Sequence, residues 1–372
     1  MKIGIISTIE NYEWAGTEEV WSQFAKIALQ QGHEVHVSLH WRIAQAHQVI
    51  LLQQQGLQVS VRRPFRPTRF YLLKERYWSD LQELQKFRPD ILLINSGSLF
   101  DILNLLVLRQ FCLISPVPKV FFCHFVAEGF FPHNRERVIE FIEMIHGWVF
   151  VSKHNRYLAE RQLGFYFNNV QTIINGSRLI LKNPLPLPTD NTVQLACVAR
   201  LETLWKGQDV LLEVLSESQW SDRSWHLNLY GTGQDENYIK QLIDHYNLAE
   251  RVTFHGYVRD IESVWRQNHL MVLASRGEGT PLAVLEAMMC GRPTVTTDAG
   301  GNREILNNYE TGWIAEAATP YSFSRALESA WEHREYWPKI GQAAHQAAKQ
   351  ISEANPAQQL LDYLLSLYFL FH

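Results

Sequence analysis

The sequence has few cysteines, and their spacing excludes several classes of protein. Four occur among 372 residues, each inside an apolar segment and none at the short spacing of a zinc or redox motif: Cys112, Cys123, Cys197 and Cys290. Disulfide-rich secreted domains use cysteine far more densely. We therefore expect four free, buried thiols in a reducing compartment.

Long apolar runs are also lacking, and we expect no signal peptide. The chain starts directly on a strand pattern, Lys2 to Ser7, where a signal peptide would have a charged region followed by an apolar core. The best candidate for a membrane span, 102–112, is interrupted by Asn104 and Arg109. We therefore predict a cytoplasmic protein that at most touches the inner face of a membrane.

The chain also lacks a large excess of positive charge, and this excludes bulk nucleic-acid binding. The 34 Lys and Arg residues nearly balance the 38 Asp and Glu residues, which leaves a formal net charge of −4.

What the chain does have is length and a regular alternation of short apolar runs with helical patterns. A chain of 372 residues is too long for one ordinary core, so two domains are expected. The predicted strands are 3–7, 34–39, 90–95, 119–125, 148–152, 193–199, 226–230, 252–257, 269–274 and 294–297. Such alternation predicts an α/β fold of two Rossmann-like, doubly wound domains, each with a parallel sheet covered by helices.

A proline-rich stretch sets the predicted domain boundaries. Three prolines within 183–190 favour an extended connector. We predict an N-terminal domain at 1–182, a linker at 183–190, a C-terminal domain at 191–345, and final helices at 346–372 that return to the first domain. The last segment, 358–371, is strongly apolar. Burial on the first domain explains that composition, and a membrane-surface helix is the alternative.

The segment 275–301 carries most of the functional information. A predicted strand leads into a Gly-rich turn with Glu278, and Pro281 then opens a helix that contains Glu286. The free amides at a helix start attract phosphate, so one carboxylate would lie on either side of a bound phosphate. Ionised carboxylates accept hydrogen bonds from hydroxyl groups, and a nucleotide sugar has this order of ribose, diphosphate and sugar. A solvated Glu286 is the alternative.

The residues around this turn resemble the signature of the retaining glycosyltransferase family 4. The matching runs are Glu-Gly-Thr-Pro-x-x-x-x-Glu-Ala-Met from Glu278, Gly-Arg-Pro-Thr-Val from Gly291, and Gly-Gly-x-x-Glu-Ile from Gly300. The resemblance implies a GT-B fold, in which two domains face each other across a crevice and the last helix crosses back to the first. It also implies that Glu278 binds the transferred sugar, that Glu286 binds the ribose, and that the donor lies at Gly279, Thr280, Pro281 and Leu282.

Two cations follow the first predicted strand of the second half. Arg200 lies at the end of this strand and Lys206 just before a helix. Arg can fork onto phosphate oxygens and Lys supplies a compact charge, which stabilises a departing diphosphate. Their spacing matches the Arg/Lys pair of family 4, and solvated loop charges are the alternative. With two cations for the diphosphate and no Asp-x-Asp motif at a strand end, we predict no metal and no other cofactor.

Four further positions are assigned by resemblance to the same family. Gly16 keeps one glycine of the family's Gly-Gly-x-Glu loop, in which Ala15 replaces the other. His124 ends a predicted strand and matches a histidine that contacts the donor sugar. Gly231, in Tyr-Gly-Thr-Gly, and Val258, after His-Gly-Tyr, match turns that border the nucleotide and its base.

Basic and aromatic residues interleave at 61–78, with six Lys or Arg residues against a single Glu. This pattern suits single-stranded nucleic acid, an anionic membrane surface or a lipid-diphosphate acceptor, and a solvated charge run is the alternative. Because the rest of the chain indicates sugar chemistry, we expect an acceptor or a peripheral membrane contact here and no nucleic acid.

These features predict a retaining, metal-independent hexosyltransferase. We expect it to move a hexose, with glucose from UDP-glucose as the first choice, to a saccharide or lipid-linked acceptor during polysaccharide or glycolipid assembly. The predicted catalytic residues are His124, Arg200, Lys206 and Glu278. Two alternatives stay open: a nucleotide-sugar epimerase on the same fold, and a catalytically silent sugar-nucleotide-binding protein.

Overall fold

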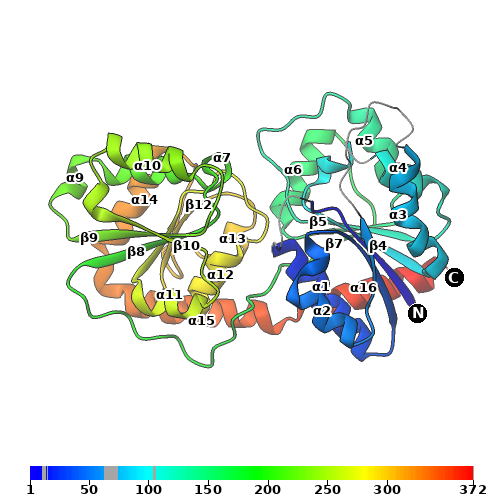
Figure 1. Cartoon of the computed structure of the whole chain (residues 1–372). Coiled ribbons are helices and arrows are strands. Elements are labelled where there is room, and N and C mark those ends of the chain that lie inside the picture. Colours follow the sequence, from blue (N-terminus) through cyan, green and yellow to red (C-terminus); the bar gives the residue numbers. More distant parts are fainter. Residues whose placement is uncertain (11–13, 15, 63–73, 104–105, 372) are drawn as a thin grey trace. The chain divides into compact units, whose positions relative to one another are not determined.

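The protein divides into two compact units, each built on one parallel sheet (Figure 1). The computed structural model describes residues 1–10, 14, 16–62, 74–103 and 106–371. Unit 1 comprises Met1–Ile174 and Asn355–His372, and unit 2 comprises Asn175–Ala354.

Unit 1 contains a 7-stranded sheet in the order β3-β2-β1-β4-β5-β6-β7. Its strands are β1 (Lys2–Ser7), β2 (Glu34–His40), β3 (Gln58–Arg62), β4 (Ile91–Ser96), β5 (Lys119–Cys123), β6 (Gly147–Phe150) and β7 (Val170–Thr172). Its helices are α1 (Gly16–Gln30), α2 (His47–Gln54), α3 (Lys74–Phe87), α4 (Leu106–Ile114), α5 (Arg135–Ile142), α6 (Lys153–Leu163) and α16 (Pro356–Phe371), with 3-10 turns η1 (Ile43–Gln45) and η2 (Leu99–Leu103). The strand order reverses between β1 and β4, as expected for a doubly wound sheet.

Alternate side chains of the unit 1 strands point to opposite faces of the sheet and form two separate cores. Ile5 and Leu93 pack with residues of α1 and α16 on one face. Ile6 and Leu92 pack with residues of α3, α4 and α5 on the other. The period of two along each strand, with both faces buried, explains why these strands read as continuous apolar runs in the sequence.

The last helix, α16, belongs to unit 1 although it follows unit 2 along the chain. Leu360 and Leu364 lie in the same core as residues of α1. The hydroxyl of Tyr363 accepts a hydrogen bond from the backbone amide of Trp148, at 3.2 Å. The prediction that the terminal helix returns to the first unit is confirmed, and its burial explains its apolar composition. None of the helices in the described parts of the chain is long and apolar enough to cross a membrane.

Unit 2 contains a 6-stranded sheet in the order β10-β9-β8-β11-β12-β13. Its strands are β8 (Val193–Val198), β9 (Trp225–Tyr230), β10 (Val252–Gly256), β11 (Leu270–Leu273), β12 (Thr294–Thr297) and β13 (Trp313–Ala315). Its helices are α7 (Thr203–Lys206), α8 (Gln208–Leu215), α9 (Ser218–Ser221), α10 (Glu236–His245), α11 (Ile261–Gln267), α12 (Leu282–Met289), α13 (Asn302–Ile305), α14 (Pro320–Glu332) and α15 (Trp337–Glu353), with 3-10 turns η3 (Ala249–Arg251) and η4 (Arg334–Tyr336). Here the order reverses between β8 and β11.

The unit boundaries lie several residues away from the predicted ones, and the proline-rich stretch is part of unit 2. The guanidinium group of the fully buried Arg292 donates to the carbonyl oxygens of Leu185 and Pro186, at 3.0 and 2.6 Å. At the other boundary, α15 continues without a break to Glu353. The prolines therefore stiffen a segment that is held against unit 2, and the passage between the units comes earlier, at Ile174 and Asn175.

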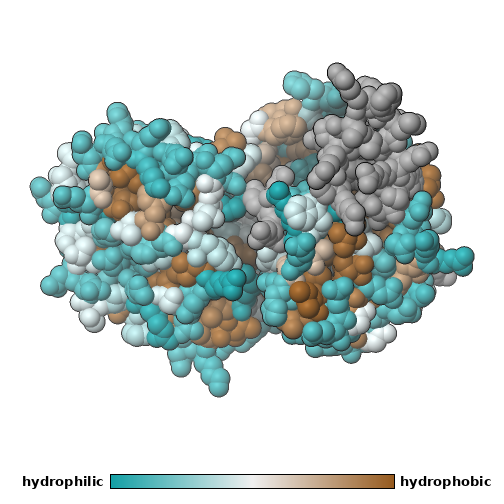
Figure 2. All heavy atoms as spheres, viewed as in Figure 1, coloured by the Kyte–Doolittle hydropathy of each residue, from teal (hydrophilic) through white to brown (hydrophobic). Residues whose placement is uncertain are grey.

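The four cysteines lie inside the units, whereas the face drawn in Figure 2 is largely hydrophilic with small apolar groups. All four are free and buried, as the sequence predicts. Burial raises the pKa of each thiol to about 12, because a thiolate is poorly solvated in an apolar interior.

Candidate active site

The reversal of strand order in unit 2 brings two functional loops together. β8 and β11 are neighbours, with Leu195 paired to Leu270. After β8 come Arg200 and then α7, which ends in Lys206, and the loop after β11 carries Glu278. In doubly wound sheets, ligands bind at the carboxyl ends of the strands where the order reverses. The topology therefore places three of the predicted site residues at this position.

Glu278 and Lys206 form an ion pair across this reversal point. The Lys206 Nζ lies 2.7 Å from Glu278 Oε1, and the Ser275 hydroxyl donates to the same oxygen at 2.6 Å. Only 7% of the Glu278 side chain and 16% of the Lys206 side chain are exposed. A partly desolvated, charge-assisted pair of this kind holds both groups in fixed positions.

Two glycines allow the loops to approach this closely. Gly207 has φ +64°, and a Cβ there would lie 1.9 Å from the carbonyl oxygen of Ala274. Gly300, after β12, has φ +54°, and a Cβ there would lie 2.0 Å from the carbonyl oxygen of Glu278. Any other residue at either position would therefore displace the turn that carries Glu278.

The turn after Glu278 leads into α12, and Glu286 lies inside this helix. Pro281 is the N-cap residue and the helix begins at Leu282, one residue later than predicted. Glu286 is 3% exposed. The alternative interpretation, in which Glu286 is solvated, is therefore wrong. Its Oε1 accepts from both Nε and Nη2 of Arg178, at 3.2 and 3.0 Å.

Arg178 is a site residue that the sequence did not reveal. It is separated from Glu286 by 108 positions, and nothing in its neighbourhood marks it as a partner. The preceding Asn175 donates from its backbone amide to the hydroxyl of Thr280, at 3.3 Å. The segment after the unit boundary therefore lies against two of the residues that were predicted to bind the donor.

Arg200 lies at the predicted strand end, and its guanidinium group pairs with a carboxylate only two residues further along the chain. Its Nη1 forms an ion pair with Glu202 Oε1 at 3.1 Å, and 45% of its side chain is exposed. Its carbonyl oxygen accepts from the side-chain amide of Gln208, at 2.7 Å. The structure thus brings Lys206 and Glu278 together and holds Arg200 beside Glu202.

Gly231 and Val258 follow neighbouring strands, β9 and β10. The amide of Gly231 donates to the carbonyl oxygen of Gly256, at 2.7 Å, and Val258 is half-buried two residues further on. Both therefore lie at the carboxyl edge of the sheet, on the side of β8 away from Glu278.

The other two predicted residues, Gly16 and His124, belong to unit 1. His124 follows β5, is 6% exposed, and its Nε2 lies 2.9 Å from the side-chain oxygen of Asn95. Burial lowers the pKa of His124 to about 3, so its imidazole is neutral near pH 7. Gly16 begins α1, and its neighbour Ala15 lies outside the described residues.

Glu18, two residues after Gly16, is a further buried polar group at this edge of unit 1. The Ser7 hydroxyl donates to its Oε1 at 2.5 Å, and burial raises the pKa of the carboxyl above its usual range. Arg62 is also buried and donates to the Ser38 carbonyl oxygen at 2.6 Å. Most of the basic and aromatic stretch at 61–78 lies outside the residues whose side chains are described.

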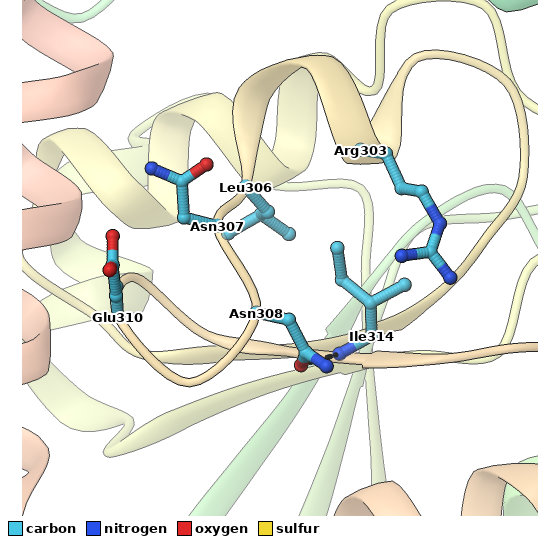
Figure 3. A pocket seen from close by; sticks show the side chains of 6 residues that line it. All are labelled: Arg303, Leu306, Asn307, Asn308, Glu310 and Ile314. Carbon is cyan, nitrogen blue, oxygen red and sulfur yellow. Dashed lines mark hydrogen bonds between the residues drawn. The ribbon is translucent and has the colours of Figure 1, made fainter.

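Unit 2 also has a surface pocket that is lined by other residues (Figure 3). It has a volume of about 420 Å³ and is lined by Arg303, Leu306, Asn307, Asn308, Glu310 and Ile314. Two of its polar side chains have partners within the protein: Arg303 Nε lies 2.5 Å from Asp298, and Asn308 accepts from the amide of Ile314 at 3.0 Å. No predicted donor-binding residue lines it, so it is not our candidate site.

Comparison with known proteins places the second half of the chain in a family. Residues 179–347 match the family model described as glycosyl transferases group 1. The putative glycosyltransferase EpsD of Bacillus subtilis is 28% identical over 157 residues, which is 42% of this chain and 41% of that protein. A UDP-Gal:α-D-GlcNAc-diphosphoundecaprenol α-1,3-galactosyltransferase of Escherichia coli is 35% identical over 81 residues, 22% of this chain and 21% of that protein. These alignments span less than half the length of either relative.

Solved structures extend the likeness of the fold to both units. Anabaena HepE, in complex with UDP and glucose, superposes with a TM-score of 0.79 at 20% identity, covering 98% of this chain and 100% of that chain. The sucrose-phosphate synthase of Thermosynechococcus elongatus gives a TM-score of 0.72 at 15% identity, covering 99% of each chain. At such identities the likeness establishes the fold alone, and it confirms the predicted GT-B class. We therefore identify residues 179–347 as a domain of the group 1 glycosyltransferase family, in a chain with the GT-B fold.

Proposed function

We propose that the protein is a retaining glycosyltransferase of family 4 that transfers glucose from UDP-glucose to a saccharide or lipid-linked acceptor in polysaccharide or glycolipid assembly. One observation carries the proposal. A partly buried Lys206–Glu278 ion pair lies at the reversal of strand order, directly before a helix start, and the buried Glu286 lies inside that helix. The cation and the helix amides can bind the diphosphate of a nucleotide sugar. The two carboxylates can accept hydrogen bonds from its ribose and from its sugar.

The proposed reaction uses these residues in separate roles. The bond between the anomeric carbon and the diphosphate oxygen breaks, and Lys206 and Arg200 stabilise the charge that develops on the leaving group. The acceptor oxygen bonds to the same face of the sugar, and its proton passes to the leaving phosphate. Glu278, held in place by its ion pair with Lys206, accepts hydrogen bonds from the sugar hydroxyls. His124 contacts the sugar near its primary hydroxyl.

Nucleotide binding is assigned to the surrounding loops of unit 2. Glu286 would accept hydrogen bonds from the ribose, and Gly231 and Val258 would border the nucleotide. UDP is the proposed carrier because HepE binds UDP and glucose and the E. coli relative is described as using UDP-galactose. The diphosphoundecaprenol in the name of that relative supports a lipid-linked acceptor. We propose that no metal or other cofactor is required.

Thermal-shift screening against UDP-, GDP- and ADP-sugars tests the donor, because a ligand that binds only the native state raises the unfolding temperature. UDP compounds should give the largest shift, and a response confined to GDP compounds would overturn the base assignment. Incubation with EDTA should leave both the shift and transfer unchanged if no metal takes part.

Product analysis separates the proposal from its two alternatives. Donor consumption with an acceptor and a product of unchanged anomeric configuration is expected. An epimerised nucleotide sugar would identify an epimerase, and binding without any donor turnover or hydrolysis would identify a silent binding protein.

We further propose that the protein acts in the cytoplasm and contacts the inner membrane face through residues 61–78. Flotation with anionic vesicles tests the contact. Replacement of the basic residues in this stretch should abolish co-flotation, and unchanged co-flotation would refute the contact.

A further inference from the structure

Arg276 joins the two loops that meet at the reversal of strand order in unit 2. Its Nη1 donates to the carbonyl oxygen of Thr203, at 2.7 Å. Its backbone amide donates to the carbonyl oxygen of Trp205, at 2.9 Å. One residue of the loop after β11 thus holds both ends of α7, the single turn that ends in Lys206.

Asp209 fixes the direction in which the Arg276 side chain points. The two carboxylate oxygens of Asp209 accept from Nη1 and Nη2 of Arg276, at 2.8 and 2.7 Å. A bidentate pair of this kind restricts the planar guanidinium group more strongly than a single contact does. Asp209 lies in the first turn of α8, so the pair connects the start of α8 to the end of β11.

Hydrogen bonds, rather than apolar packing, determine where α7 lies. None of its residues is buried, and Leu204 is 64% exposed. Its other anchor is Asp235, which accepts from the amide and the hydroxyl of Thr203, both at 2.8 Å. A one-turn helix is unstable alone, so the position of Lys206 depends on these polar contacts.

We propose that Arg276, oriented by Asp209, is a positioning residue of the donor site: it holds the turn that carries Lys206 at the distance where Nζ reaches Glu278 and the leaving diphosphate. This inference rests on the proposed function and adds two residues to it. Arg276 acts through Lys206 and touches no substrate. Preorganised charge loses much of its effect when it is displaced by about 1 Å.

The chain offers a matched control for Asp209. Glu328 forms a bidentate pair with Arg223 in the same unit, with Oε2 2.7 Å from Nη1, and its side chain is 28% exposed, as is that of Asp209. Asp209→Asn and Glu328→Gln each remove one negative charge from such a pair. Asp209→Asn should weaken UDP binding and lower kcat by about tenfold each, whereas Glu328→Gln should leave both unchanged.

A double-mutant cycle separates positioning from general stability. In a Lys206→Ala background, Asp209→Asn should have no further effect on UDP affinity, because the group it positions is missing. Arg276→Lys should behave like Asp209→Asn, since an ammonium group cannot hold both Asp209 and Thr203 in the same way. Equal losses of UDP affinity with and without Lys206, or equal losses in Asp209→Asn and Glu328→Gln, would overturn the proposal.

Amide hydrogen exchange tests the same inference without any ligand. Asp209→Asn should speed exchange in residues 203–207 relative to the wild type and to Glu328→Gln. Unchanged exchange there would refute the positioning role. If wild-type protein binds no nucleotide while this exchange still rises, the proposed function fails and the structural role of Arg276 stands.

Discussion

The strand order reverses in the same way in both sheets, but the groups at the carboxyl edges of the two sheets differ in charge. In unit 2 the reversal point carries paired full charges, Lys206 with Glu278 and Arg276 with Asp209. In unit 1 it carries His124, whose pKa is lowered by burial, and Glu18, whose pKa is raised by burial. Both shifts favour the uncharged form. One fold can therefore carry fixed ion pairs at this edge in one unit and, in the other, a histidine and a glutamate whose charged forms are disfavoured by burial, because the loops decide the chemistry.

This difference agrees with the division of labour that we propose. A diphosphate donor needs fixed cations and fixed hydrogen-bond acceptors, which unit 2 supplies. A sugar or acceptor hydroxyl can be bound by an uncharged polar group such as the imidazole of His124 in unit 1. Each prediction below tests one side of this comparison, starting with the largest expected effect.

Glu278→Ala should abolish most transfer while leaving nucleotide affinity nearly intact. We expect kcat to fall by about 10²- to 10³-fold, the range for losing one fixed polar group that acts in the transition state. Steady-state transfer assays and calorimetric titration with UDP measure the two quantities. A comparable loss in both would mean that Glu278 binds the nucleotide, and the proposed roles of the two glutamates would have to be exchanged.

Glu286→Ala should weaken UDP binding by about 10- to 100-fold, because hydrogen bonds to a charged group contribute about 1.5–3 kcal/mol. It also leaves Arg178 without its carboxylate partner. Glu262→Ala, which removes a glutamate from an i,i+4 pair with Arg266 on α11, is the control and should change nothing. Equal UDP affinity in wild type and Glu286→Ala would defeat the ribose assignment.

His124 should make the stability of unit 1 depend on pH. Its native pKa of about 3 lies below the usual value of 6.5, so below pH 6.5 the unfolded chain binds a proton that the native state does not. The resulting loss of stability grows as the pH falls from 6.5 toward 3. Between pH 7.5 and pH 5 the wild type should lose about 2 kcal/mol more unfolding free energy than His124→Gln. Urea unfolding at the two pH values measures this, and parallel losses in both proteins would contradict a neutral His124.

The smallest effect concerns the buried thiols of both units. With the pKa of each raised to about 12, none of the four cysteines should react measurably with a thiol reagent at pH 8 in the native protein. All four should react after unfolding in guanidinium chloride. Rapid labelling of native protein would show that one of the cores opens locally.

The fold was largely predictable because its central strands are buried on both faces. All ten predicted strands are present in the structure. The three that were missed, β3, β7 and β13, lie at sheet edges. An edge strand pairs on one side only, and β7 and β13 have only three residues each, so their apolar pattern is too short to recognise.

The candidate site was predictable only where its residues are close in sequence. Glu278, Pro281 and Glu286 lie on one strand–turn–helix unit, so local pattern and spacing identify them. Arg178 was missed because its contact with Glu286 spans 108 positions. Arg276 was visible beside Glu278, but its role depends on Asp209 and Thr203, which come from another loop.

Local sequence pattern accounts for the order of strands and helices, the helix start after Glu278, and the apolar face that buries α16, because these depend on side-chain periodicity and on short-range backbone preference. The partners of Glu278, Glu286 and Arg292 depend on which loops and strands become neighbours when the sheets form. The sequence determines which loops carry the charged residues. The strand order of unit 2 determines which of these residues meet, because an ion pair needs its partners within a few ångströms in space, whatever their separation in sequence.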